Sequence, residues 1–352
     1  MAYTTIDKPS DYFNTKLYTG SDGTSAISGV GFQSDWTWIK CRSNGGSVSF
    51  EHVLTDAVRG VNKTLVSNDT DAETTNNATG YLSVFGTDGF TVTGGDAVNG
   101  VGRTYASWNW KAGTSFTNDA SATGIGSIDS TGSVNTDAGF SIVKWTVGGG
   151  VNGLAVAHSL GVAPKIIIYK RINSTGDWYV WLNKVIDSSQ DYLVLNTTSA
   201  KADINSGTYG IPSSTLISNF GFANIEMIAY CFAEKKGYSK FGSYTGNGNA
   251  DGTFVYTGFK PAMLIIKNSS AGSTNWTIID NKMNPSNQMN IRLTPNSNEA
   301  EQVNSNPKDF LSNGFKLRTT GSYENGSGAS YIYMAFAENP FVTSTAVPAT
   351  AR

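Results

Sequence analysis

One strand design occurs three times in this sequence, and it constrains the fold more than any other feature. In each copy a turn signal leads into an apolar run that a lysine ends, at residues 31–40, 161–170 and 258–267. A strand rich in aromatic residues closes each copy, at residues 106–111, 228–234 and 332–338. Internal similarity of this kind is the signature of repeated structural units, so the chain is predicted to contain three copies of one unit.

The composition predicts that these units are built from strands. Charged residues make up only 15% of the chain, against about 25% in an average soluble domain, and many of its 39 glycines stand in turn-like clusters. Asp88-Gly89 and Asn313-Gly314 predict two-residue turns between strands, and residues 219–222 carry a variant of this signal. We therefore predict an all-β chain of three related antiparallel β-sandwiches. They are expected to be jelly-roll-like, because the cysteine and tryptophan framework of immunoglobulin domains is absent.

The spacing of the repeats sets the predicted domain boundaries. These are a first unit with a short lead at 1–113, a linker rich in Ser, Thr, Asn and Gly at 114–138, a second unit at 139–237, and a third unit with an extended tail at 238–352. Residues 54–65 fit a short helix, and residues 125–128 fit a short strand inside the linker. Only residues 235–237 separate the second and third units, which predicts that these two pack tightly. The sequence leaves open whether the units stand in a row or surround a pseudo-threefold axis.

Charge, cysteine content and hydropathy restrict the expected partners and compartment. A net charge of -2 without a basic stripe argues against nucleic acid as a partner. Cys41 and Cys231 lie in strand-like runs of different units, which favours two buried thiols over a disulfide. No basic and apolar leader opens the sequence, and no apolar run approaches the ~18 residues of a membrane helix. We expect a soluble protein that is made in a cytoplasm and is not inserted into a membrane.

Two patterns that suggest a chemical site are more typical of structural roles. His52 and His158 lack cysteine or acidic neighbours at the spacing of metal ligands. Residues 148–153 have the glycine spacing of a dinucleotide-binding loop, but that loop needs a helix after it, and here an all-β context follows. A glycine-rich hairpin loop is the preferred interpretation.

Two further patterns involve acidic residues. Residues 247–252 resemble the start of a calcium loop, but Gly258 stands where such a loop requires glutamate. The preferred interpretation is a polar connection between strands, and the alternative is a weak calcium site on the surface. Glu234 and Glu338 recur at matched positions of two units, which indicates structure rather than catalysis. We predict no catalytic residues, no cofactor-binding residues and no metal ligands in this chain.

Aromatic residues divide into those that recur between units and those that do not. Five of them occupy matched positions, where recurrence predicts a core role: Trp178 with Trp276, and Trp110 with Phe232 and Phe336. Non-recurring aromatics near turns, such as Tyr209 and Tyr323, are better candidates for exposed contacts with a sugar, whose C–H groups stack on flat rings. The sequence does not identify the residues that bind a ligand, so these stay unknown.

Longer stretches of the sequence resemble a known protein family. They are residues 3–20, 237–248, 310–318 and 331–341. Together they are similar to a family of bacteriophage virion proteins labelled tail fibre or structural protein, and the similarity extends over nearly the whole chain. Ser34 departs from the family pattern, which has proline at this position, and this departure implies a looser start of that strand.

The resemblance implies a non-catalytic virion protein that is made in the host cytoplasm without a signal peptide. The expected role is a tail fibre or receptor-binding subunit that recognises the host surface. The alternatives are a capsid-decorating protein on the head and, less favoured, a glycan-degrading tail enzyme. The expected partners are other virion proteins, further copies of the chain in a homotrimer, and a glycan or receptor on the host, with no cofactor.

Overall fold

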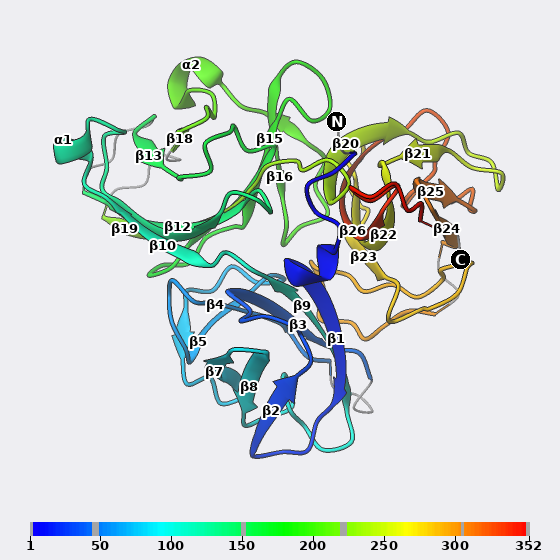
Figure 1. The fold of residues 1–352 in the computed structure, drawn as a ribbon, viewed down its shortest axis with the longest axis horizontal. Helices are drawn as coiled ribbons and strands as arrows, with labels where there is room; N and C mark the ends of the chain where they lie inside the picture. The colour runs from blue at the N-terminus through cyan, green and yellow to red at the C-terminus, as the bar shows by residue number, and fades with distance from the viewer. Residues whose placement is uncertain (1–2, 44–48, 149–152, 219–223, 304–305, 350–352) are drawn as a thin grey trace.

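The computed structural model describes residues 3–43, 49–148, 153–218, 224–303 and 306–349. The fold is all-β and its sheets are antiparallel, as predicted. Helical structure in the described ranges is limited to three single turns, η1 (Pro9–Asp11), α1 (Ala120–Thr123) and α2 (Ser206–Tyr209). The strands form three two-sheet units, which we call unit one (β1–β9), unit two (β10–β19) and unit three (β20–β26) (Figure 1). A jelly-roll-like order of strands stays a prediction.

One sheet of each unit, the inner sheet, faces the middle of the molecule. In unit one its order is β1 (Phe13–Thr19), β9 (Thr104–Trp110), β3 (Trp36–Cys41), β4 (His52–Asp56), β5 (Lys63–Val66) and β6 (Thr74–Thr75). In unit two it is β10 (Thr114–Asn118), β11 (Ser130–Asn135), β12 (Phe140–Val147), β19 (Ile225–Phe232), β14 (Ile166–Arg171), β15 (Tyr179–Asn183), β16 (Gln190–Val194) and β17 (Ala202–Asp203). In unit three it is β20 (Ser239–Thr245), β26 (Ser330–Pro340), β22 (Phe259–Asn268) and β23 (Thr277–Asp280). In every unit the closing aromatic strand therefore pairs with the strand that ends in lysine.

A smaller outer sheet covers each inner sheet. It consists of β2 (Thr24–Ser28), β8 (Gly89–Thr93) and β7 (Tyr81–Gly86) in unit one. The outer strands of unit two are β13 (Ala155–Ala157) and β18 (Leu216–Ser218). Those of unit three are β21 (Phe254–Tyr256), β25 (Gly314–Leu317) and β24 (Lys308–Leu311). A separate apolar cluster fills the space between the two sheets of each unit.

The register of the strands confirms the predicted alignment of the repeats. The strands that end in lysine pair with the aromatic strands at matched residues: Trp36 with Trp110, Ile166 with Phe232, and Met263 with Phe336. In each unit the lysine follows four residues later, at Lys40, Lys170 and Lys267. Positions can therefore be compared between units one residue at a time.

The three inner sheets surround one shared core. Trp110, Phe232 and Phe336 meet at its centre, with ring centroids 6.4, 5.9 and 5.6 Å apart in the three pairs. Each of these rings is only 1% exposed, and the surrounding apolar cluster draws residues from all three units. Three equivalent rings in mutual contact place a pseudo-threefold axis there, so the units do not stand in a row. The predicted core role of the recurring aromatics is confirmed.

Burial on both faces explains the composition of the inner strands. All six residues of β3 are buried, as are the first five of β14, because one face packs on the shared core and the other on the outer sheet. A strand that is buried on both faces reads as a continuous apolar run rather than as an alternating one. Ser34, expected to loosen the start of β3, is buried there, and its hydroxyl donates to the Trp36 carbonyl at 3.0 Å.

Two predictions of local structure are wrong. Residues 114–138 are not a linker, because they form β10, α1 and β11, which extend the inner sheet of unit two beyond β12. Residues 54–65 are not a helix, because they contribute to β4 and β5, which pair with each other around a turn. In both segments, hydrogen bonds to a neighbouring strand override a weak local preference. Tight packing is also not confined to units two and three, since all three units share the core.

The predicted hairpins β7–β8 and β24–β25 are present, but their glycines serve another purpose. The two-residue loops are Thr87-Asp88 and Ser312-Asn313, one residue earlier than predicted, and Gly89 and Gly314 begin the next strands. A Cβ on Gly89 would lie 2.0 Å from the Ile27 carbonyl oxygen, and one on Gly314 would lie 2.1 Å from that of Val255. Glycine is therefore needed for the close approach of the adjacent strand. The variant signal at 219–222 lies outside the described residues.

Candidate functional site

Three equivalent lysines join the units in a closed ring. Lys40, Lys170 and Lys267 are fully buried, and burial lowers the pKa of each to about 8. Each ammonium donates to a backbone carbonyl of the neighbouring unit: Lys40 to Asn298 at 2.9 Å, Lys170 to Thr70 at 2.7 Å, and Lys267 to Thr198 at 3.2 Å. These bonds run from unit one to three, from two to one and from three to two. Buried cations are tolerated only with such partners, so the lysines are structural.

A second ring of hydrogen bonds runs in the same direction. Its donors occupy the position paired with each lysine: His52 Nε2 to the Thr294 carbonyl at 2.9 Å, Trp178 Nε1 to Val66 at 2.7 Å, and Trp276 Nε1 to Val194 at 3.1 Å. A carbonyl only accepts, so Nε2 of His52 carries the proton, and Nδ1 accepts from Trp38 Nε1 at 2.9 Å. Burial lowers the pKa of His52 well below its usual value, and the imidazole is neutral.

A repeated asparagine anchors this ring, and sequence reasoning missed it. The side-chain oxygens of Asn68, Asn196 and Asn296 accept from the backbone N–H of the ring donors at 3.0, 2.8 and 2.8 Å. The signal was a Leu-x-x-Asn pattern that starts at Leu65, Leu193 and Leu293. Residues that recur in all three units thus hold the units together, and a functional site is better sought among residues that break the repeat.

The histidine outside the rings also has a structural partner in the folded chain. His158 is buried, Nε2 lies 3.1 Å from the Ser213 carbonyl, and burial lowers its pKa to about 4. Most of the 148–153 glycine run lies outside the described residues, and β13 rather than a helix follows it. In the described ranges, no group of three or more His, Cys, Asp or Glu side chains is arranged to hold a metal ion. Cys41 and Cys231 are both free and buried, as predicted.

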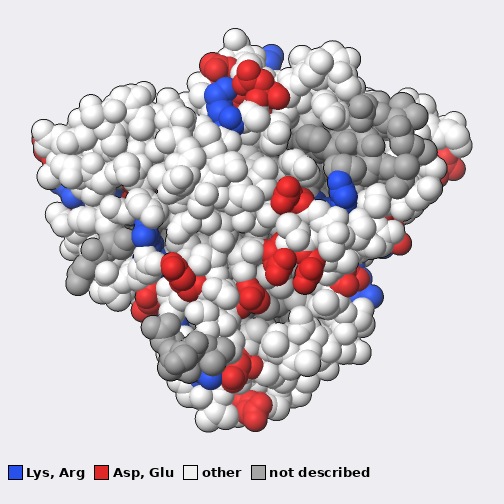
Figure 2. Space-filling model, turned by 180° about the vertical axis from the view of Figure 1, so that it is seen from behind, with Lys and Arg blue, Asp and Glu red and all other residues white. Residues whose placement is uncertain are grey.

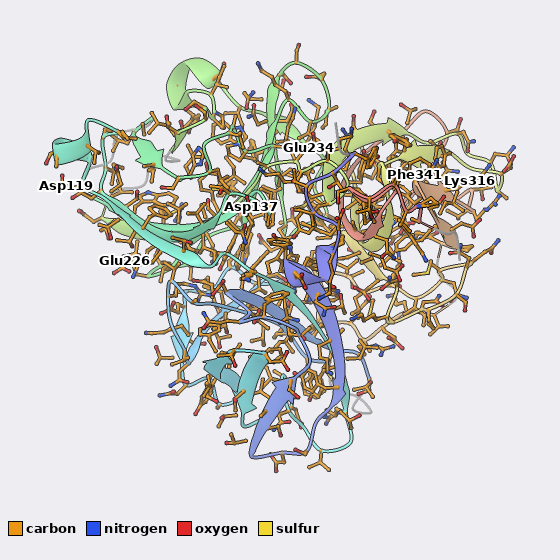
Figure 3. The ribbon with its side chains drawn as sticks, in the orientation of Figure 1. Asp119, Asp137, Glu226, Glu234, Lys316 and Phe341 are labelled. Carbon is orange, nitrogen blue, oxygen red and sulfur yellow. The ribbon has the colours of Figure 1, made fainter. Side chains whose placement is uncertain are left out.

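The acidic candidates are paired with cations. In the calcium-like segment, Asp251 forms ion pairs with Lys316 at 2.6 Å and Arg318 at 3.2 Å. Glu234, at the junction of units two and three (Figure 3), accepts from the Phe241 N–H at 2.9 Å and pairs with Lys240 at 3.5 Å. These contacts account for the carboxylates without a metal.

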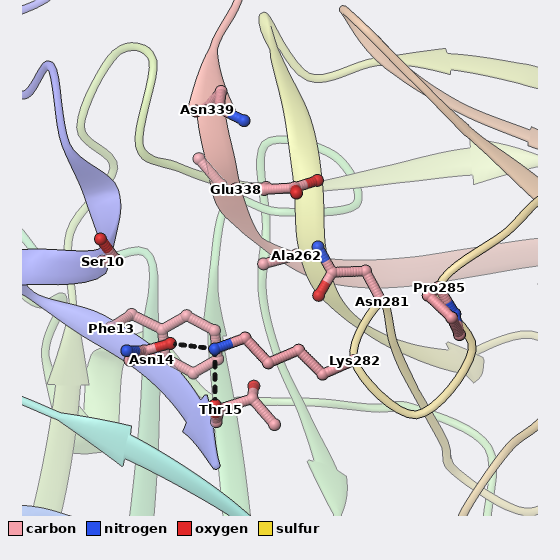
Figure 4. Close-up of a pocket in the computed structure, with 11 residues that line it drawn as sticks. Ser10, Phe13, Asn14, Thr15, Ala262, Asn281, Lys282, Pro285, Glu338 and Asn339 are labelled. Atoms are coloured by element: carbon pink, nitrogen blue, oxygen red, sulfur yellow. Dashed lines mark hydrogen bonds between the residues drawn. The ribbon is translucent and has the colours of Figure 1, made fainter. Parts of the chain in front are cut away.

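One break in the repeat is a pocket between units one and three. It has a volume of about 460 Å³ (Figure 4). Volumes of about 300–1,000 Å³ are typical of small-ligand sites. Its lining comes from η1, β1, β22, the segment after β23 and the end of β26: Ser10, Phe13, Asn14, Thr15, Ala262, Asn281, Lys282, Pro285, Ala337, Glu338 and Asn339. We call it the junction pocket.

A buried carboxylate orders the wall of the junction pocket. Asp280 accepts at Oδ2 from Thr15 Oγ1 at 2.5 Å and from Trp108 Nε1 at 3.1 Å, which ties unit three to unit one. Burial raises the pKa of Asp280, and these hydrogen bonds oppose the rise. Tyr230 binds Asp56 in the same way between units two and one, at 2.8 Å. The third junction carries apolar residues, Met334 and Leu182, at the matched positions.

Asn281 is the residue of this wall whose side chain is left without a partner. It is only 3% exposed, yet no donor among the described residues reaches its Oδ1. Lys282, next to it, donates to Asn14 Oδ1 at 2.6 Å and to the Thr15 carbonyl at 2.8 Å, and partial burial lowers its pKa (Figure 4). Glu338, on the opposite wall, pairs with Lys260 at 3.4 Å.

A second break in the repeat is an exposed pair of aromatic rings on the edge strand β21. Phe254 is 43% and Tyr256 53% exposed, whereas the register places Ala26 and Ser28 at the matched positions of unit one. The hydroxyl of Tyr3 lies 3.2 Å from that of Tyr256. We call these three rings, Tyr3, Phe254 and Tyr256, the aromatic edge.

Sequence reasoning chose other aromatics for exposed contacts. Tyr209 is half-buried against the core of unit two, and Tyr323 is half-buried under the guanidinium of Arg292, 4.8 Å from its ring. Both rings are therefore partly covered, and their role in exposed contacts stays a prediction. Phe254 and Tyr256 could have been found by the same rule, because they lack aromatic counterparts in unit one.

The surface carries few charges. On the face drawn in Figure 2, Lys and Arg side chains are scattered and form no continuous patch. No helix among the described residues combines the length and the apolar character needed to cross a membrane.

The chain matches the profile of one protein family over residues 8–340, and the description of that family is a domain of unknown function, DUF7483. No curated protein and no solved structure matches it. The matched range covers all three two-sheet units, in agreement with the shared core and the closed hydrogen-bond rings. The chain therefore belongs to the DUF7483 family.

Proposed function

We propose that this protein is a non-catalytic bacteriophage virion protein, a tail fibre or receptor-binding subunit that recognises the host surface. The resemblance of four sequence stretches to virion proteins suggests the setting. The observation that carries the recognition role is the aromatic edge, in which Phe254 and Tyr256 are exposed at positions where unit one has small residues. Exposed aromatic faces stack on the C–H groups of sugars, and the rigid three-unit body holds these rings in fixed positions.

A capsid-decorating role is the second candidate, and the pseudo-threefold arrangement favours it. A single chain with approximate threefold symmetry presents similar surfaces in three directions, which suits a threefold position of an icosahedral shell. The same shape suits the end of a trimeric fibre. A homotrimer of the chain stays a prediction, and the mass of the purified protein under native conditions tests it.

Labelling of intact virions with gold-conjugated antibodies against the full chain separates the candidates. Label on the tail or its fibres is expected for host recognition. Label over the head would replace this role with decoration of the shell, and particles without label would exclude a virion protein.

The role of the aromatic edge is tested with purified protein and host cells. The double variant Phe254→Ala with Tyr256→Ala should bind host cells about tenfold more weakly, because its stacking surface is lost. Its thermal stability should not change, since both rings are exposed. Val61→Ala is a suitable control, because this exposed apolar residue lies in unit one, away from β21. Equal binding by the double variant and the wild type would contradict the proposal.

A further inference from the structure

We propose that the junction pocket binds an uncharged polyhydroxylated ligand, a sugar ring, and that the Asn281 side chain is its principal hydrogen-bonding partner. The choice of a host-surface glycan as the source of this sugar rests on the proposed function. The chemistry of the pocket does not depend on that choice.

The first argument comes from the three matched positions. Three matched positions lie at the end of, or directly after, the strand that pairs with the lysine-ending strand: Ala57, Asn183 and Asn281. Their N–H groups donate to the matched carbonyls of Asp35, Lys165 and Ala262. In unit two the amide is satisfied inside the protein, because Asn183 Nδ2 donates to the Pro164 carbonyl at 2.8 Å and Oδ1 accepts from Gln190 Nε2 at 3.0 Å. Unit one has Ala57 at this position, so it has no side-chain amide that needs hydrogen-bond partners there.

In unit three the same amide lacks such partners and borders a pocket instead. The proline equivalent to Pro164 is Pro261, which lies inside β22 and pairs with Ala337 of β26. The Asn281 side chain is 97% buried, and its Oδ1 has no hydrogen bond from the described residues. A buried amide oxygen without a donor is costly to folding, which indicates that a bound group supplies the donor. The amide projects from its wall toward Glu338 on the other side of the pocket (Figure 4).

The second argument concerns charge. The Lys282 ammonium is held by Asn14 and Thr15, and the Glu338 carboxylate faces Lys260, so the ionic groups of the lining already have internal partners. A ligand of either charge would have to compete with these contacts. The amides of Asn281 and Asn339 and the hydroxyl of Ser10 complete the polar lining. Amides and hydroxyls both donate and accept, which matches the hydroxyl groups of a sugar.

Saturation-transfer NMR with the full-length protein tests the inference. The probes are glucose, galactose, N-acetylglucosamine and rhamnose, with glucuronate as the charged comparison. At least one neutral sugar should bind, and glucuronate should bind more weakly than glucose. Absence of binding by all four neutral sugars, or tighter binding of glucuronate, would overturn the proposal.

Two variants locate the binding site. Asn281→Leu should weaken sugar binding about tenfold and raise the melting temperature, because it removes an unsatisfied buried amide. Asn281→Ala removes the same amide without adding bulk to the pocket, so it should weaken sugar binding even if Leu disturbs the lining. Val61→Ala, an exposed residue outside both the pocket and the aromatic edge, serves as the control and should leave sugar binding unchanged. A third variant, Tyr256→Ala, reports on the aromatic edge. Loss of sugar binding in Tyr256→Ala, but in neither Asn281 variant, would assign the sugar to the aromatic edge and refute the pocket.

The sugar-binding test of the pocket and the labelling test of the virion role can fail independently of each other. Sugar binding that depends on Asn281, combined with virions that carry no label, would refute the virion role and keep the pocket. Labelled tails, combined with a pocket that binds none of the probes, would do the reverse.

Discussion

At the scale of single residues, one matched position carries His52, Trp178 and Trp276 and keeps the same hydrogen bond to the next unit. An imidazole and two indoles can replace one another there because each presents one ring N–H at a similar distance from the backbone. The paired lysines do not vary, since only a long side chain with several donors reaches carbonyls in two units. Lys170, for example, binds Thr70 of unit one and Gly176 of its own unit, both at 2.7 Å.

Replacement of one ring lysine should destabilise the protein. In Lys267→Met, the carbonyls of Thr198 and Asn268 lose the buried ammonium that donates to them. Buried acceptors left unsatisfied cost about 1–3 kcal/mol, so the free energy of unfolding in urea should fall by that amount. Lys8→Met is the matched control, because Lys8 forms only an exposed ion pair with Asp11 and should change stability little. Equal stability of the two variants would contradict a structural role for the lysine ring.

The two histidines predict how stability depends on pH. Burial lowers the pKa of His158 to about 4 and that of His52 well below its usual value, whereas an unfolded histidine titrates near about 6.5. Below about pH 6.5 the unfolded chain binds protons that the folded chain does not, so each histidine lowers the stability as the pH falls. For His158 this contribution extends from about 6.5 down to about 4, with a slope of about 1.4 kcal/mol per pH unit.

NMR spectra of the histidine rings provide the measurement. In the folded protein, neither ring should titrate between about pH 8 and 5.5, while both should titrate near 6.5 in the urea-unfolded chain, which is the control. A folded-state titration near neutral pH would mean that the imidazole in question is accessible to water.

Among the secondary-structure elements, two hairpins were predicted correctly, but the glycines that predicted them are needed for a different reason. The glycines of Asp88-Gly89 and Asn313-Gly314 mark the hairpins, but the turn itself uses the two residues before each glycine. Glycine is required at these positions because the backbone of the adjacent outer strand passes within van der Waals distance of its Cα hydrogens.

Gly314→Ala should therefore displace β21, the strand of the aromatic edge. The added Cβ would lie 2.1 Å from the Val255 carbonyl oxygen, a backbone atom that cannot move alone. We expect a loss of stability of about 1–3 kcal/mol and weaker host binding together. Gly148→Ala is the control, because a Cβ there meets nothing within 4 Å and the backbone is not left-handed. A stable Gly314→Ala variant with unchanged host binding would show that β21 tolerates the displacement.

At the scale of the whole molecule, the shared core couples the three units. The cluster around Trp110, Phe232 and Phe336 contains residues of all three inner sheets, so no unit can unfold without exposing the core of the others. Calorimetry should therefore show one cooperative unfolding transition with equal calorimetric and van't Hoff enthalpies. Three resolved transitions would mean that each outer cluster stabilises its unit independently of the shared core.

Features that depend on local pattern and on recurrence could be predicted from the amino-acid sequence alone. Continuous apolar runs, turn signals and matched aromatics predicted the all-β class, the three units and the core role of Trp110, Phe232 and Phe336. Recurrence works as evidence because equivalent positions in a symmetric fold face equivalent surroundings. The strand-like surroundings of Cys41 and Cys231 also correctly predicted two buried free thiols.

The way in which the three units meet could not be predicted and is seen only in the folded chain. The pseudo-threefold axis, the rings of lysine and imidazole or indole bonds, and the junction pocket all join residues more than 60 positions apart in the sequence. No local pattern encodes such contacts, because the acceptors are backbone carbonyls, which every residue possesses. Asn183 and Asn281 occupy matched positions, yet the Asn183 amide has hydrogen-bond partners inside the protein and the Asn281 amide borders a pocket. The neighbouring strand, not the asparagine, makes that difference.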